Sequence, residues 1–146
     1  MKEEKQITFF IDRCLGKKHI AEALRKAGIT VEIHDDHFEN NAQDVEWLPE
    51  VGKKGWVVLT KDAKIGKNNT EQLAVAYAGI KMFALASQNL SGPDMAQIFL
   101  ATIVKMQEFV RQNPAPFIAK VYRDGRIDMY KDAEKLKEKM LKEDSY

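Results

Sequence analysis

The chain has 146 residues, of which 45% are hydrophobic and 31% charged, with a formal net charge of +1 at pH 7. This length allows one domain with a substantial core and is short for two. A charge so close to neutral gives no global attraction to nucleic acid, so nucleic-acid binding would need a local basic patch. The single cysteine excludes an internal disulfide and a zinc site built from paired cysteines.

The sequence contains no apolar run near the roughly 20 residues of a membrane span. Residues 1–5 are mostly charged and lead directly into an apolar stretch, which is not the pattern of a signal peptide. We therefore expect a cytoplasmic protein with no membrane partner.

The first half of the chain alternates between strand and helix patterns. Residues 7–11 form an apolar run that predicts a central strand buried on both faces. Residues 17–27 have helical spacing and stop at Gly28, and residues 29–33 predict a second strand. Strand–helix–strand units with short links are parallel and right-handed.

A second helix is expected after the polar loop 38–43, capped by Asn41 or Asp44. Pro49 either lies inside this helix, where it removes one hydrogen bond, or takes the tolerated first position after Leu48. A strand follows at residues 56–60.

The second half continues with a helix up to Gly79, a strand over residues 80–86 and a long helix that starts at Ser91 and ends before Pro114. Asp124-Gly125 predicts a hairpin between residues 117–122 and 127–130, and residues 132–142 predict a charged helix. The whole pattern predicts a three-layer α/β/α sandwich with a mostly parallel sheet, a C-terminal hairpin and a charged helix. We expect one domain over residues 1–130, followed by a charged helix and tail over residues 131–146.

Acidic residues follow three of the predicted strands. Asp12 follows the first strand, Asp35 and Asp36 follow the second, and Asp62 follows the third. Ligands of open α/β sheets bind outside the carboxyl ends of the strands. Carboxylates gathered there suit a hard divalent cation such as Mg²⁺, which prefers oxygen ligands.

Basic residues accompany these acids. Arg13, Lys17 and Lys18 follow the first strand, whereas Lys61, Lys64 and Lys67 surround the end of the third. Acidic groups that hold a metal beside basic groups that hold a phosphate are typical of a metal nuclease. Each acid taken alone can also be a turn former or helix cap.

Two other features allow competing interpretations. His34-Asp35-Asp36-His37 could supply imidazoles to a transition metal, but adjacent residues do not all face one point, so a solvated loop is the simpler reading. Cys14 lacks the downstream arginine of a phosphatase nucleophile, because Ile20 stands there, and we expect a packed or half-exposed thiol.

The order of motifs along the chain resembles a PIN-like domain, most closely the PIN-like branch of VapC-type toxins. The resemblance covers about residues 7–130 and rests on four stretches: Phe9 to Asp12, Ile20 to Leu24, Asp44 to Glu50 and Gly55 to Asp62. Asn113 to Ile118 and the basic hairpin after it are also similar to that branch.

This resemblance implies a Rossmann-like nuclease fold and a Mg²⁺- or Mn²⁺-dependent site that cleaves RNA. Position by position, it assigns Asp12, Asp44 and Asp62 as catalytic acids and metal ligands, and Thr60 as their support through its hydroxyl. Asp36 is a further candidate ligand and Glu46 a further supporting residue, and which of Asp35, Asp36, Asp44 and Glu46 completes the site stays open. Arg13, Lys61, Lys64 and Lys67 are the candidate substrate-binding residues.

The sequence departs from the family pattern at Arg13, where relatives often carry an acid or amide, and after Asp62, where they are richer in arginine. The alternative function is therefore an inactive or weakly active PIN-like binding protein that acts through a protein or nucleic-acid partner. The partners to be considered are RNA, an antitoxin protein and a second copy of the chain.

Overall fold

The computed structural model of the chain describes residues 6–61, 69–87 and 89–144. Six strands form one sheet in the order β2-β1-β3-β4-β5-β6, with β6 antiparallel to β5 and all other neighbours parallel. In chain order the elements are β1 (Thr8–Ile11), the 3-10 helix η1 (Arg13–Leu15), α1 (His19–Lys26), β2 (Thr30–Ile33), the 3-10 helix η2 (His34–Asp36), α2 (Asp44–Lys54), β3 (Val57–Lys61), α4 (Asn69–Ala78), β4 (Lys81–Leu85), α5 (Gly92–Gln112), β5 (Phe117–Val121), β6 (Ile127–Lys131) and α6 (Ala133–Asp144).

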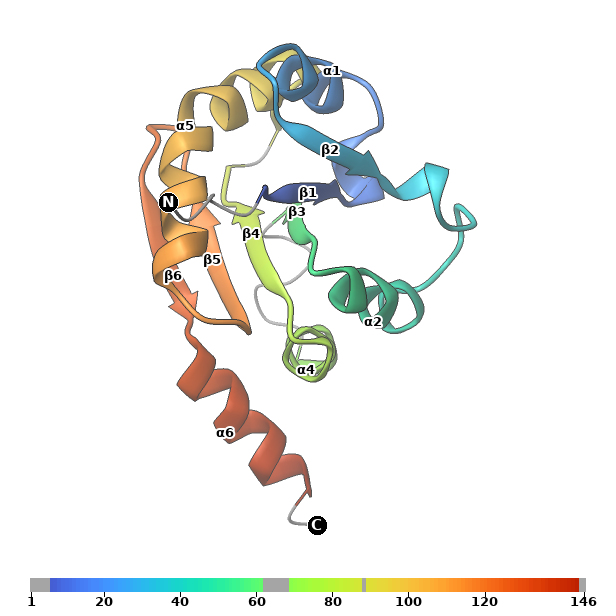
Figure 1. Cartoon of the computed structure of the whole chain (residues 1–146), viewed down its shortest axis with the longest axis vertical. Coiled ribbons are helices and arrows are strands. Elements are labelled where there is room, and N and C mark those ends of the chain that lie inside the picture. Colours follow the sequence, from blue (N-terminus) through green and yellow to red (C-terminus); the bar gives the residue numbers. More distant parts are fainter. Residues whose placement is uncertain (1–5, 62–68, 88, 145–146) are drawn as a thin grey trace.

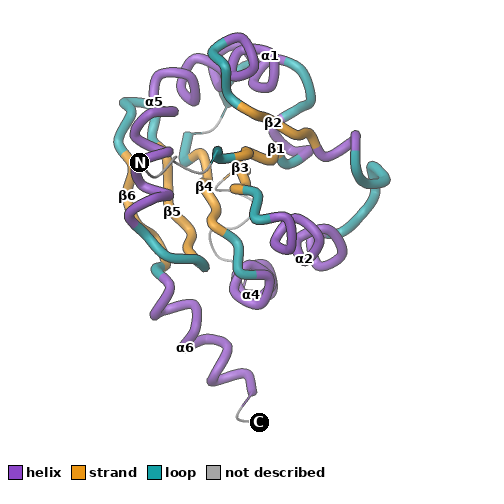
Figure 2. Tube along the Cα trace, viewed as in Figure 1, coloured by secondary structure: helices purple, strands orange, loops and turns teal. Residues whose placement is uncertain are grey.

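Helices cover both faces of the sheet, as Figures 1 and 2 show. Successive side chains of a strand point to opposite faces, so Phe9 and Ile11 of β1 join the core beneath α1 and α5, whereas Phe10 joins the core beneath α2 and α4. These three side chains are at most 1% exposed, which confirms a central strand buried on both faces. The predicted three-layer α/β/α sandwich with a mostly parallel sheet is confirmed.

Helix α2 begins at Asp44 as its first helical residue, after Gln43 as N-cap. The expectation that Asn41 or Asp44 is the cap is therefore wrong, because the cap lies between these two residues. The side chain of Glu46 accepts a hydrogen bond from the Gln43 backbone N–H at 3.2 Å, which ties the first turn together. Pro49 lies inside the helix, so of the two alternatives the interior position is the correct one.

The turn and cap signals in the second half are confirmed. Ser91 caps α5, because its Oγ accepts a hydrogen bond from the Asp94 backbone N–H at 3.2 Å. The hairpin between β5 and β6 turns at Asp124-Gly125, where Gly125 has a φ of 89° and the Asp124 carboxylate accepts a hydrogen bond from the Arg126 N–H at 3.0 Å. Only glycine adopts such a φ at no steric cost.

Helix α6 leaves the end of β6 and extends beside α4 (Figure 1). Leu136 is fully buried in the core beneath α2 and α4, and the Tyr77 hydroxyl of α4 donates a hydrogen bond to Asp144 at 2.9 Å. The charged C-terminal helix is thus anchored by the buried Leu136 and by Met140, which is partly buried and packs against the same core.

None of the helices in the described part of the chain is long and apolar enough to cross a membrane.

Candidate active site at the carboxyl edge of the sheet

The strand order reverses between β1 and β3. From β1 the chain moves outward to β2 and then returns to the other side of β1 to form β3. In open α/β sheets the carboxyl edge at such a switch point is where ligands bind. Asp12 directly follows β1 and Thr60 is the fourth residue of β3, so both lie at this point.

Asp12 and Thr60 are joined across the switch point. The Thr60 hydroxyl donates a hydrogen bond to Asp12 Oδ2 at 2.8 Å, and the Asp12 backbone N–H donates to the Leu59 carbonyl at 2.9 Å. Asp12 is 2% and Thr60 1% exposed. Since burying a carboxylate is costly unless it is hydrogen-bonded or binds a cation, this position is typical of a functional group.

Asp44 begins α2 towards the same edge of the sheet, and an aromatic contact joins this helix to β1. The rings of Phe10 and Trp47 lie 5.1 Å apart. Asp12 stands two residues beyond Phe10 on the same strand face, about 6.6 Å further towards the carboxyl edge. Asp44 stands three residues before Trp47 on the same helix face, about 4.5 Å further towards the start of α2, which is the end that follows β2. Asp44 is 8% exposed, and with Asp12 it makes up the buried carboxylates of the described residues.

Asp35 has different surroundings one strand further out. Its Oδ1 accepts a hydrogen bond from Arg13 Nε at 3.1 Å, Lys17 Nζ lies 4.0 Å from Oδ2, and His34 Nδ1 lies 3.2 Å from Oδ1. Partial burial raises the pKa of the Asp35 carboxyl, but the His34 hydrogen bond and the Arg13 charge together hold that pKa below its ordinary value. Asp35 is an ion-paired carboxylate, and Arg13 is its nearest partner.

The two histidines after β2 face different partners. His34 is buried, with its ring 6.2 Å from Phe10 and 5.7 Å from Trp47, whereas His37 Nε2 lies 2.8 Å from Glu32. The simpler reading of a solvated loop is therefore wrong for His34, which is part of the aromatic core. The sequence signal for the burial of His34 was Phe10, because a buried aromatic side chain needs packing partners on its face of the sheet.

The remaining candidates lie around this edge. Asp36 is exposed on η2, Lys61 is the last residue of β3, and Glu46 is exposed on the first turn of α2. A hollow of about 620 Å³ lies between η2 and α2, and its lining residues are Asp35, His37, Phe38, Glu39, Asn41, Ala42 and Glu46. Asp62, Lys64 and Lys67 lie outside the described residues.

The donor chemistry at the switch point fits a hard cation. Buried carboxylate oxygens of Asp12 and Asp44 and the hydroxyl of Thr60 are the oxygen donors that Mg²⁺ and Mn²⁺ prefer. Within the described ranges no three histidine, cysteine or acidic side chains lie close enough together to hold a metal ion. A cation held by two carboxylates from this region would therefore need at least one further ligand. Asp62, which follows β3 directly in the sequence, is the candidate.

Cys14 is the residue near the site whose place the sequence did not reveal. Its Sγ lies 3.4 Å from Thr60 Oγ1, and the residue is half-buried, as expected for a packed thiol. The 3-10 helix η1 turns the chain after Asp12, where the Leu15 N–H donates a hydrogen bond to the Asp12 carbonyl at 3.0 Å. This turn brings Cys14 close to Thr60. Nothing in the sequence pattern indicates this turn.

The fold and this edge define a PIN-like protein, and comparison with known proteins agrees. The family model described as "PIN like domain" matches residues 7–87, more than half of the chain, so the chain belongs to the PIN-like domain family. The chain is also 29% identical over 117 residues to the Mycobacterium tuberculosis protein named "Putative ribonuclease VapC45", and the alignment covers 77% of this chain and 84% of that protein. No solved structure matches the chain. The resemblance to PIN-like domains and to their VapC branch is thus confirmed.

Proposed function

We propose that this protein is a metal-dependent endoribonuclease of the PIN-like type and the toxin of a toxin–antitoxin pair. The observation that carries the proposal is the buried pair of Asp12 and Thr60, hydrogen-bonded across the switch point. The similarity to a relative named as a ribonuclease supports RNA as the substrate. Both residues lie within the span that matches the family.

We assign Asp12, Asp44 and Asp62 as ligands of Mg²⁺ or Mn²⁺, with Asp36 as a further candidate and Glu46 in a supporting role. When bound, such a cation lowers the pKa of a coordinated water and stabilises negative charge on a phosphoryl oxygen. The burial of Asp44 supports it over Asp35, whose oxygens are directed at Arg13, Lys17 and His34.

The protein's own residues orient these groups. Thr60 fixes the rotation of the Asp12 carboxylate by occupying Oδ2, which holds the ligand in a defined position before a cation arrives. Arg13, Lys61, Lys64 and Lys67 would hold the phosphates of the RNA. In the hydrolysis a water oxygen bonds to phosphorus, the bond from phosphorus to the leaving sugar oxygen breaks, and a proton from the water ends on that oxygen.

Cleavage of single-stranded RNA in the presence of Mn²⁺ tests the proposal. We expect Asp12→Asn and Asp62→Asn to abolish Mn²⁺-stimulated cleavage while the protein stays folded by circular dichroism. Asp128→Asn is the matched control, because Asp128 is an exposed carboxylate on β6 that lies 3.5 Å from Arg126. It loses the same charge and should cleave as the wild type does.

The alternative, an inactive PIN-like binding protein, predicts the opposite result. Wild type would then cleave no RNA with Mn²⁺ and show no metal-dependent rise in melting temperature. Co-expression with the product of the neighbouring gene tests the antitoxin partner, and sedimentation of the purified protein tests a homodimer. A cytoplasmic location is proposed with this function and would be contradicted by finding the protein outside that compartment.

A further inference from the structure

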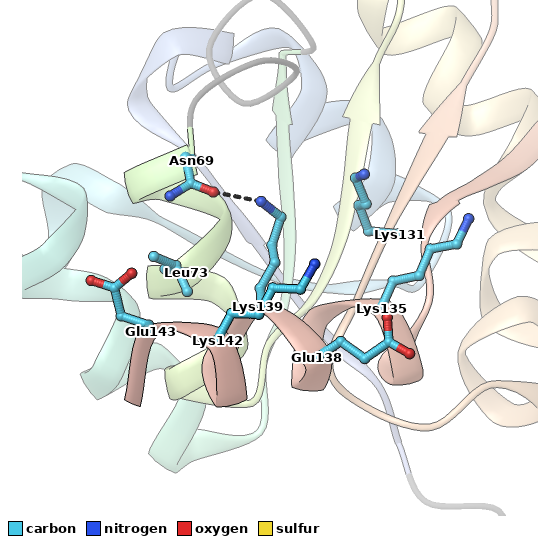
Figure 3. A pocket seen from close by; sticks show the side chains of 8 residues that line it. All are labelled: Asn69, Leu73, Lys131, Lys135, Glu138, Lys139, Lys142 and Glu143. Atoms are coloured by element: carbon cyan, nitrogen blue, oxygen red, sulfur yellow. Dashed lines mark hydrogen bonds between the residues drawn. The ribbon is translucent and has the colours of Figure 1, made fainter. Parts of the chain in front are cut away.

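A second hollow, rich in lysine, lies between α4, β6 and α6. Its volume is about 440 Å³, and Figure 3 shows the side chains around it. The residues that line it are Asn69, Leu73, Lys131, Lys135, Glu138, Lys139, Lys142 and Glu143. Four ammonium groups thus face two carboxylates and one apolar side chain.

The lysines come from one stripe of a helix and the strand before it. Lys135, Lys139 and Lys142 are four and three residues apart on α6, so they share one face of that helix. Lys131 is the last residue of β6. In Figure 3 the amino group of Lys139 reaches across to Asn69 at the start of α4 and donates a hydrogen bond to its side-chain oxygen.

Much of this positive charge is not neutralised by the protein. Within residues 6–61, 69–87 and 89–144, Lys131, Lys135 and Lys139 form no ion pair with a carboxylate. Lys131 instead lies 5.1 Å from the ring of Tyr130, and Lys120 of β5 lies 4.4 Å from the same ring. Lys120 therefore extends the basic patch onto the sheet.

The patch lies on the same face of the sheet as the candidate active site. Leu136 of α6 and Phe10 of β1 belong to one core, and Thr60 shares the strand face of Val58 in that core. Asn69 begins α4, the helix that follows β3, so its end of the helix is the one nearest the carboxyl ends of the parallel strands. The hydrogen bond from Lys139 to Asn69 brings the middle of α6 to this end of α4, whereas Lys131 pairs with Ile118 near the start of β5 and lies towards the amino ends of the parallel strands.

We propose that the lysine stripe of α6, with Lys131, is a binding site for the phosphate backbone of RNA on the face of the sheet that carries Phe10 and the candidate active site. This inference rests on the proposed function, because it takes RNA as the ligand. Flexible lysines bind phosphates without reading bases. Among the described residues that line the hollow, Leu73 is the single apolar one and none is aromatic. A protein-binding pocket would be expected to hold aromatic or aliphatic anchors, so this lining favours RNA over an acidic segment of a partner protein.

The test is RNA binding by the full chain in EDTA, where no metal-dependent cleavage takes place. Fluorescence anisotropy with a labelled single-stranded RNA compares wild type, Lys135→Gln/Lys139→Gln and the matched control Lys26→Gln/Lys105→Gln. The control removes the same charge from the exposed C-terminal part of α1 and from α5 on the opposite face. Glutamine at residue 139 retains a donor for Asn69, and circular dichroism verifies folding.

Each phosphate contact on a single strand contributes about 0.7 to the slope of log Kd against log salt, or a factor of about five at 0.1 M salt. We therefore expect the α6 variant to bind RNA about 25-fold more weakly at 0.1 M salt, with a slope lower by about 1.4. The control should bind as the wild type does.

Four outcomes would overturn the inference: no RNA binding by wild type, unchanged RNA binding by the α6 variant, equal losses in both variants, or a loss that affects binding of a poly-glutamate peptide but not of RNA. The last outcome would assign the patch to an acidic protein partner. The inference and the proposed function also fail separately. If RNA binding depends on α6 but no Mn²⁺-dependent cleavage is found, only the proposed nuclease activity is refuted. If wild type cleaves RNA but the α6 variant binds RNA unchanged, only the proposed binding site on α6 is refuted.

Discussion

Asp12 and Asp35 occupy equivalent places in the sequence and very different places in the structure. Both follow an apolar parallel strand, Asp12 after β1 and Asp35 within η2 after β2. Asp12 is 2% exposed and bonded to a neutral hydroxyl, whereas the side chain of Asp35 is 23% exposed and bonded to Arg13, with His34 and Lys17 nearby. The difference comes from their strands, because β1 has neighbours on both sides and β2 lies at the border of the sheet.

This comparison teaches that a carboxylate at a strand end acquires its chemistry from the adjacent strands. Next to β3, Asp12 is buried and accepts a hydrogen bond from the uncharged hydroxyl of Thr60. At the border, Asp35 is reached by basic side chains from the segment after β1, and the ion pair satisfies it. Four measurements test this contrast.

The largest expected effect is on RNA cleavage. Asp12→Asn should lower the rate of Mn²⁺-dependent cleavage by on the order of a thousandfold, the size of effect seen when a charge-stabilising group is removed from an active site. Asp35→Asn should stay within about threefold of wild type, since it loses an ion pair outside the proposed ligand set. Equal losses in the two variants would erase the distinction between the two acids.

Removing the Thr60 hydroxyl should have the next largest effect. Thr60→Val keeps the shape but removes the donor to Asp12, and the loss of an outer partner of a metal ligand typically costs roughly 10- to 100-fold in metal affinity or activity. Thr60→Ser retains the hydroxyl and is the control. Isothermal titration with Mn²⁺ measures the affinity, and a valine variant that binds Mn²⁺ as tightly as the serine variant would contradict the role given to Thr60.

The melting temperature of the Asp12→Asn variant should change in the opposite direction to its activity. Without metal, Asp12→Asn removes a buried charge and should unfold at the same temperature as wild type or a higher one, in line with the trade-off between stability and function. It should also lose the rise in melting temperature that Mn²⁺ gives wild type. A drop in melting temperature in EDTA would show that Asp12 serves the fold more than a metal.

The smallest effect concerns the pH dependence of stability. Because the pKa of Asp35 is lowered in the folded protein, its ion pair stabilises the fold fully above the ordinary value of 3.8 and loses that effect as the pH falls through the lower folded pKa. Arg13 is half exposed, so the contribution should be only about 0.2–1 kcal/mol. Urea unfolding should show Arg13→Gln less stable than wild type at pH 7 and equal to it near pH 2.

Much of the molecule followed from local patterns in the sequence. The apolar run from Phe9 to Ile11 determined a strand buried on both faces, Ser91 and Asp124-Gly125 determined a helix start and a hairpin, and the order of motifs determined the PIN-like family. These features depend on backbone preferences and on side-chain spacing within one segment, so no long-range contact is needed to recognise them. The exact cap of α2 was missed, because Gln43 caps as well as its neighbours once Glu46 bonds back to its N–H.

Only the tertiary structure decided which acids are buried and what each one contacts. The resemblance to the family assigned Asp12 and Asp44 as metal ligands and left Asp35 as one candidate to complete the site, whereas the assembled sheet buries Asp12 and Asp44 and pairs Asp35 with Arg13. The same is true of the lysines of α6. The sequence placed them on a charged helix, and only the structure shows that Leu136 packs this helix beside α4. Burial, hydrogen bonding and electric field at a residue depend on side chains from distant segments, and those meet only when the strands pair.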